Sequence, residues 1–240
     1  MSVNITAAPL SASVTNDWRN AAKLIDHTLL KPDATPEQVA ALCADAVQYG
    51  FFLVMVNPAN VALASAHVRG TSVRVGTVVG FPLGANLTVT KVAEAEAVLR
   101  HGAHELDMVI NVGALKSGNR TLVQTEMQVL AQFARGGGAV LKVILETALL
   151  TQEEKILACA LAMEAGADFV KTSTGFAGSE ATVRDVALMR GVVGHKLGVK
   201  AAGGIRTLAQ FIDMVDAGAN RIGASASVDI MRELGAAAGE

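Results

Sequence analysis

Three short stretches share one pattern, and this pattern decides the fold. They read AGADFVKT at residues 165–172, HGAHELDM at residues 101–108 and AGANRIGA at residues 217–224. In each, a helical stretch ends at a glycine and an apolar strand begins two residues later, because glycine readily forms the left-handed turn that stops a helix. The copies are unevenly spaced, which indicates a recurring helix-to-strand unit and not a short-period solenoid.

The same alternation of short apolar runs and longer amphipathic stretches continues in both directions along the chain. The predicted strands lie at about residues 23–28, 51–57, 74–80, 105–111, 140–146, 168–172, 197–201 and 221–223. The predicted helices include residues 36–49, 88–101, 121–135, 151–165, 182–194, 208–217 and 227–234. Strands that alternate with helices run parallel, because each crossover passes through a helix. We therefore expect an α/β protein with a closed (β/α)8 TIM barrel, and a doubly wound open sheet is the alternative.

The composition indicates one large globular domain. Of the 240 residues, 51% are hydrophobic and 18% are charged, which is enough apolar material for a sizeable core. No linker rich in glycine and serine divides the chain. We therefore assign residues 21–240 to the barrel and residues 1–20 to an N-terminal extension.

Charge and hydropathy argue against two classes of partner. The formal net charge is −2 and aromatic residues make up 4% of the chain, so we expect neither a basic surface nor a stacking platform for nucleic acid. The N-terminus lacks the basic start and long apolar run of a signal peptide, and the apolar stretches are too short for a membrane span. We expect a cytoplasmic protein without a membrane partner.

Charged residues lie late in several predicted strands, where a barrel of this kind holds its active site. Lys171 ends the sixth strand, Lys200 ends the seventh, and Asp107 interrupts the fourth. Side chains alternate along a strand, and alternate strands fill the same interior layers of a barrel. Lys171 and Asp107 are therefore expected to face each other across the interior, with Lys200 on the neighbouring strand.

Two amines this close would each lower the pKa of the other, and burial would act in the same direction. A lysine near neutrality attacks carbonyl groups, so the pattern indicates a Schiff-base nucleophile at Lys171. Asp107 would then move protons, directly or through water. The alternative is structural: Lys171 lies at the rim, Asp107 is a pairing partner, and Asp26, Lys142 and Glu146 form an ion-pair network in the barrel mouth.

Glycines follow the last two strands and indicate a phosphate site. Gly203 and Gly204 come after the seventh strand, and Gly223 and Ser225 come at the end of the eighth. Loops at these positions, with helix N-terminal amides pointing outward, form the common phosphate cradle of such barrels, and Gly175 would add a third backbone segment. The histidines form no metal-ligand cluster and no nucleotide-binding motif is present, so we expect neither a metal nor a cofactor.

Beyond these inferences, the sequence resembles the class I deoxyribose-phosphate aldolases. The matching segments occur in the family's order from about residue 24 to residue 234, and they read LIDHTLLKPDAT, GFPLG, ELDMVINVGALKSG, LKVILET, GADFVKTSTGF, KAAGGIRT and RIGAS. The resemblance implies a barrel that reversibly cleaves 2-deoxy-D-ribose 5-phosphate to acetaldehyde and D-glyceraldehyde 3-phosphate without a metal.

The resemblance also implies roles for single residues. Lys171 would form the Schiff base, Lys200 would tune that amine and share in proton transfer, and Asp107 would serve in the proton relay. The phosphate would be held at the positions already singled out, namely Gly175, Gly203, Gly204, Gly223 and Ser225. One position departs from the pattern, since some members carry a second serine where this chain has Ala226.

Three other functions stay open from the sequence. They are a Schiff-base aldolase for another phosphosugar, a non-covalent phosphosugar isomerase or synthase, and a barrel that only binds a phosphorylated ligand. Trapping an imine with borohydride and testing the donor aldehyde distinguish them. Barrels of this kind often pair, so a homodimer is one expectation for the assembly.

Overall fold

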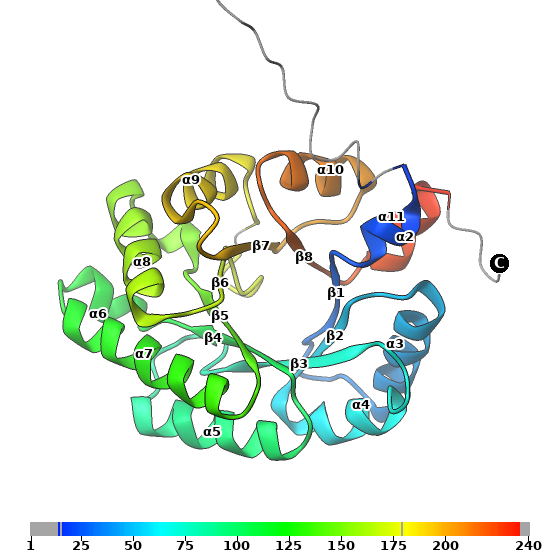
Figure 1. Ribbon diagram of the computed structural model, residues 1–240, viewed down its shortest axis with the longest axis horizontal. Coiled ribbons are helices and arrows are strands. Elements are labelled where there is room, and N and C mark those ends of the chain that lie inside the picture. The colour runs from blue at the N-terminus through cyan, green and yellow to red at the C-terminus, as the bar shows by residue number, and fades with distance from the viewer. Residues whose placement is uncertain (1–13, 15, 179, 236–240) are drawn as a thin grey trace, which may run out of the picture.

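The closed barrel is confirmed. The structure, a computed structural model, describes residues 14, 16–178 and 180–235. Over these residues eight parallel strands pair in chain order and close between β8 and β1 (Figure 1). The strands are β1 (Ile25–Leu29), β2 (Leu53–Val56), β3 (Arg74–Val79), β4 (Glu105–Val109), β5 (Val140–Ile144), β6 (Phe169–Lys171), β7 (Gly198–Ala202) and β8 (Arg221–Ala224).

Helices surround the strands and complete eight strand-to-helix units (Figure 1). They are α2 (Trp18–Ala22), α3 (Pro36–Tyr49), α4 (Val61–His67), α5 (Thr88–Arg100), α6 (Val112–Lys116), α7 (Arg120–Gly136), α8 (Gln152–Ala165), α9 (Val183–Val193), α10 (Leu208–Asp216) and α11 (Ser227–Glu233). The division at residue 20 stays a prediction, because residues 1–13 and 15 lie outside the described part of the chain.

Local sequence explains where the helices begin and end. Thr35, Thr151 and Thr207 cap α3, α8 and α10, each in a reciprocal capping box with the side chain three residues later. At the end of α8, Gly166 has φ 76°, in the left-handed region that glycine adopts without steric cost. The glycine of the recurring pattern therefore acts as the sequence predicts.

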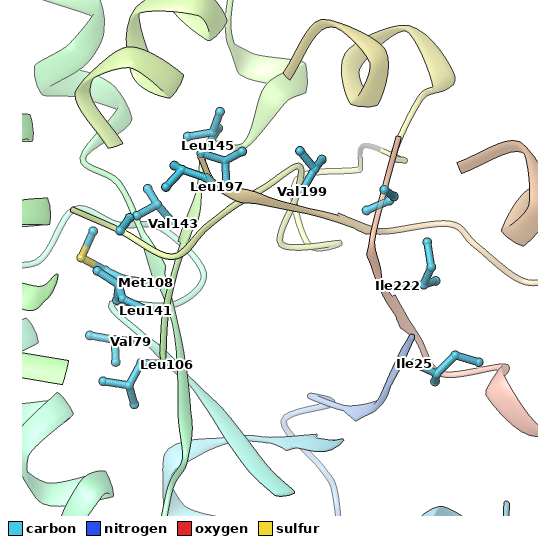
Figure 2. Close-up of a cluster of buried hydrophobic side chains, with 14 of the residues drawn as sticks. Ile25, Val79, Leu106, Met108, Leu141, Val143, Leu145, Leu197, Val199 and Ile222 are labelled. Carbon is cyan, nitrogen blue, oxygen red and sulfur yellow. The ribbon is translucent and has the colours of Figure 1, made fainter. Parts of the chain in front are cut away.

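Two layers of side chains lie on opposite faces of the strands. The outward-facing residues form the main hydrophobic core with the helices, and Figure 2 shows several of them pointing away from the barrel, among them Ile25, Leu106, Met108, Val143 and Ile222. Inside the barrel, a smaller apolar cluster gathers at β1 to β3, made of Leu30, Leu53, Met55 and Val78. Charged side chains fill much of the remaining interior.

Within the described residues, every helix is too short or too polar to cross a lipid bilayer.

Candidate active site

A cluster of charged side chains occupies the barrel interior along β4 to β8 and β1. Each member is buried, with at most 7% of its surface exposed. The cluster contains three carboxylates and four cations: Asp26, Glu105, Asp107, Lys142, Lys171, Lys200 and Arg221. Buried charges are costly unless they are paired, and ion pairs join all seven members of this cluster.

Asp107 lies at the centre of the cluster. Its Oδ2 accepts hydrogen bonds from Nζ of Lys171 and Nζ of Lys200, each at 2.8 Å. Its Oδ1 accepts from Nζ of Lys142 at 2.7 Å. The structure thus brings together the three residues that the sequence singled out, and it adds Lys142 as a third amine on the same carboxylate.

Strand parity and register place these side chains. In the strand pairing, Asp107 is aligned with Lys142, and Lys171 is aligned with Lys200, which is aligned in turn with Arg221. Gly223 leaves space for this arrangement, since a Cβ atom there would lie 3.1 Å from Cε of Lys200. The cluster therefore forms because charged residues occupy neighbouring inward positions and a glycine leaves room for Lys200 beside them.

Lys171 differs from the other cations in its contacts. Among the ion pairs of the described residues, Lys171 contacts a single carboxylate, that of Asp107. Lys142 and Lys200 each contact at least two carboxylates. Burial lowers the pKa of Lys171 from 10.5 to about 8; Asp107 opposes this shift, and Lys200 and Lys142 add to it. With three carboxylates and four cations, the cluster is neutral when Lys171 has lost its proton.

The surroundings hold Asp107 and Lys142 in their charged forms. Burial alone would raise the pKa of Asp107, but Lys142, Lys171 and Lys200 outweigh it and hold that pKa well below 3.8. Burial would likewise lower the pKa of Lys142, and here Asp107, Glu105 and Asp26 outweigh it and raise the pKa. Lys171 is therefore poised to act as a neutral amine beside a permanent carboxylate.

A pocket of about 330 Å³ opens above the cluster, at the C-terminal ends of the strands. Of the charged cluster, as far as the described residues define the pocket, Lys171 alone reaches its wall. The five residues predicted to hold phosphate line the same pocket, namely Gly175, Gly203, Gly204, Gly223 and Ser225. The amine and the glycine loops thus share one cavity.

The loops differ in detail from the expected helix-start cradle. Helix α10 begins at Leu208, four residues after Gly204. The loop between β7 and α10 therefore lines the pocket, and the first residues of α10 do not. Gly203 and Gly204 have φ values of 100° and 77°, which a residue with a side chain rarely adopts. Ala226 is the N-cap of α11 and offers no side-chain hydrogen bond to it.

Sequence reasoning missed several residues of the site. Glu105 and Arg221 belong to the cluster. Both were detectable from strand alternation, since each lies two residues before a candidate site residue, Asp107 or Gly223. Lys31 and Arg206 add cationic side chains to the pocket wall. Both lie in quoted motifs, but no pattern within the sequence placed them at the mouth.

The ion-pair network considered for Asp26, Lys142 and Glu146 in the barrel mouth is wrong for Glu146. Asp26 and Lys142 do lie in the buried cluster, with Lys142 Nζ 3.8 Å from Asp26 Oδ2. Glu146 lies apart from them and accepts hydrogen bonds from Thr174 on the loop after β6. Glu146 lies two residues after the end of β5 with a φ of 56°, so the alternation of side chains along an extended strand does not apply to it.

Among the described residues, no group of three or more histidine, cysteine, aspartate or glutamate side chains is arranged to hold a metal ion. His27 lies on the outer side of β1, where its ring packs against Phe51 at 5.0 Å between centroids and its Nε2 is 3.8 Å from Asp45. Burial lowers the pKa of His27 to about 4, and Asp45 opposes this shift.

The fold and the site agree with what comparison reveals. A family model described as DeoC/LacD family aldolase matches residues 20–240. The chain belongs to this family of aldolases. It is 57% identical over 212 residues to the deoxyribose-phosphate aldolase of Thermococcus gammatolerans, a match that covers 88% of this chain and 94% of the relative.

Solved structures of this aldolase family show the same architecture. A putative deoxyribose-phosphate aldolase from Coccidioides immitis superposes with a TM-score of 0.88 at 44% identity, covering 90% of this chain and 86% of that one. The deoxyribose phosphate aldolase of Aeropyrum pernix, described as a unique tetramer, superposes with a TM-score of 0.87 at 34% identity. It covers 93% of this chain and 94% of its own.

Proposed function

We propose that this aldolase reversibly cleaves 2-deoxy-D-ribose 5-phosphate to acetaldehyde and D-glyceraldehyde 3-phosphate through a Schiff base on Lys171. One observation carries the proposal: the single amine of the buried cluster that reaches the pocket is the one with a pKa of about 8. The names of the relatives support this choice of substrate.

The first stage forms the covalent intermediate. The neutral amine of Lys171 attacks C1 of the open-chain aldehyde, and the resulting carbinolamine loses water to give a protonated imine. The positive charge on the imine nitrogen accepts the electron pair of the C2–C3 bond as the C3 hydroxyl loses its proton. Covalent catalysis thus replaces one difficult carbanion step with easier ones.

The second stage releases the products. Glyceraldehyde 3-phosphate leaves, the remaining enamine is protonated at C2, and hydrolysis of the imine frees acetaldehyde and Lys171. Lys171 Nζ donates a hydrogen bond to Oδ2 of Asp107, and Lys200 Nζ donates to the same oxygen. Asp107 and Lys200 would hold the water that carries protons in each direction.

The phosphate end of the sugar fits the other side of the pocket. The loops after β6 and β7 contribute backbone at Gly175 and at Gly203 and Gly204. The end of β8 and the loop after it contribute Gly223 and Ser225. Glycine there lets the backbone approach an anion closely. Lys31 and Arg206, on the same wall, would add positive charge near the phosphate.

Incubation with acetaldehyde and borohydride, followed by intact-protein and peptide mass spectrometry, tests the proposal. The expected result is one reduced two-carbon adduct per chain, located on Lys171. An adduct scattered over surface lysines, or none, would contradict the Schiff base and favour a non-covalent isomerase or a binding protein. A Lys116→Leu variant, changed at an exposed lysine, is the matched control and should retain the adduct.

We further infer a cytoplasmic enzyme that self-associates. The cytoplasmic location is supported by a composition typical of a globular domain and by the lack of a membrane-spanning helix among the described residues. Self-association is supported by the tetramer of the Aeropyrum relative. A homodimer is the smallest such assembly, and light scattering at several concentrations measures it.

A further inference from the structure

Glu146 has an unusual backbone for its residue type. Within residues 14, 16–178 and 180–235 it is the one residue other than glycine with a positive φ, at 56°. It lies two residues after the end of β5, and 3% of its surface is exposed. Strained backbone persists when the surroundings hold it in place, and such positions gather at functional sites.

The carboxylate of Glu146 holds the loop that follows β6. Thr174 donates its backbone N–H to Oε2 at 3.2 Å and donates its hydroxyl to the same oxygen. The hydroxyl oxygen of Thr174 in turn accepts the backbone N–H of Phe176 at 3.1 Å. A chain of hydrogen bonds therefore runs from the segment after β5 to both sides of Gly175.

This loop forms part of two neighbouring cavities. Thr174 and Phe176 line the pocket that contains Lys171, and they also line a more apolar cavity of about 250 Å³ on the side of Leu149. The ring of Phe176 packs edge-on against Phe81 at 5.2 Å between centroids. Movement of the loop would therefore move Gly175 relative to the other phosphate-binding glycines.

We propose that Glu146 is a positioning residue for the phosphate end of the substrate: through Thr174 it fixes the backbone at Gly175, so that loss of its carboxylate weakens recognition of the phosphate and leaves Schiff-base formation at Lys171 intact. This inference rests on the proposed function. Glu146 acts through another residue and is not itself placed against the reacting atoms.

Glu146→Gly is the sharpest variant, because glycine adopts the left-handed backbone without strain while the carboxylate is lost with the rest of the side chain. We expect kcat/KM for deoxyribose 5-phosphate to fall about tenfold or more, which corresponds to the loss of a hydrogen bond to a charged group. For unphosphorylated deoxyribose we expect a fall of less than about threefold. Glu146→Gln keeps an acceptor oxygen in the same place and should lie between wild type and Glu146→Gly.

Asp168→Asn is the matched control. Asp168 also accepts a backbone N–H, from Leu141 at 2.8 Å, but at the opposite end of the same pair of strands. Its substitution should change both substrates equally. Equal losses on both substrates in Glu146→Gly, or no loss at all, would overturn the inference.

Two further measurements separate this inference from the proposed function. Calorimetric binding of inorganic phosphate needs no turnover, and its affinity should fall in Glu146→Gly and not in Asp168→Asn. Borohydride trapping of acetaldehyde should be unchanged in both variants. A wild-type protein without aldolase activity would refute the proposed function, whereas unchanged phosphate affinity in Glu146→Gly refutes the role of Glu146.

Discussion

Lys171 and Lys200 are direct partners in the pairing of β6 and β7, and their amines meet on the same oxygen of Asp107. Lys200 contacts a second carboxylate, that of Asp26, while Lys171 does not. The two lysines are chemically alike, and their surroundings separate them. Lys200 contacts two carboxylates within the barrel, and Lys171 faces the pocket with a lowered pKa.

Lys171→Leu should abolish turnover and leave the fold intact. The remaining cluster has three carboxylates and three cations, so its charges stay balanced. In the folded protein the pKa of Lys171 is about 8 instead of 10.5, so the protonated lysine lowers the free energy of unfolding. This destabilisation is fully present below pH 8 and is relieved as the pH rises from 8 to 10.5. At pH 7 the variant should therefore be at least as stable as wild type in thermal unfolding. Retained turnover in this variant would refute the assignment of Lys171 as the nucleophile.

The rate should depend on the proton of Lys171. If the neutral amine is the nucleophile, kcat/KM falls about tenfold per pH unit below a midpoint near pH 8 and levels above it. Asp107 does not contribute to this limb, because its pKa lies well below 3.8. Unphosphorylated deoxyribose is the control substrate, since its profile carries no phosphate titration; a profile flat from pH 6 to 9 would contradict the prediction.

Lys200→Leu should displace that midpoint to higher pH. Lys200 lowers the pKa of Lys171, and without it the three carboxylates are balanced only when Lys171 is protonated. The variant should also lose about 3–5 kcal/mol of stability, because Asp26 and Asp107 stay buried with one partner fewer. A slower rate with an unchanged midpoint would show that Lys200 acts in proton transfer alone.

Ala226→Ser should strengthen phosphate binding. Ala226 follows Ser225 and is the N-cap of α11, where a hydroxyl can donate to an anion or accept a backbone N–H of the helix. Inorganic phosphate should inhibit the variant more strongly, by up to about tenfold, as expected for one added hydrogen bond to a charged group. If the hydroxyl caps the helix instead, the melting temperature rises and the inhibition constant does not change.

Lys91→Met should destabilise the protein without changing its chemistry. Lys91 is a fully buried lysine outside the barrel interior, paired with Glu126 at 2.8 Å and donating to the backbone oxygen of Val109 at 2.8 Å. Its loss leaves Glu126 buried without its cation, at a cost of about 3–5 kcal/mol. Denaturant unfolding measures this loss, and a changed pH midpoint of kcat/KM would indicate an unexpected link to Lys171.

Much of the fold was predictable because it depends on short-range patterns. Most strand ends were placed within about two residues, since turn glycines and capping threonines act locally. Helix α4, which was not among the predicted segments, has only seven residues. A segment this short shows too few turns for its periodicity to be distinguished from that of a loop.

The sequence by itself determined the strand-helix alternation, the inward parity of Asp107, Lys171 and Lys200, and the glycine loops beside them, because each is set by neighbours within one turn or one strand. Only the tertiary structure decided which charges meet. Glu105 and Arg221 lie 116 residues apart and pair inside the barrel. Glu146 lies outside the charged cluster and accepts a hydrogen bond from Thr174. Such contacts follow from the closure of the barrel and the register of its strands, which bring residues far apart in the sequence within a few ångströms of each other. The pKa of Lys171 depends on these contacts, because charges interact more strongly in the buried interior than in water.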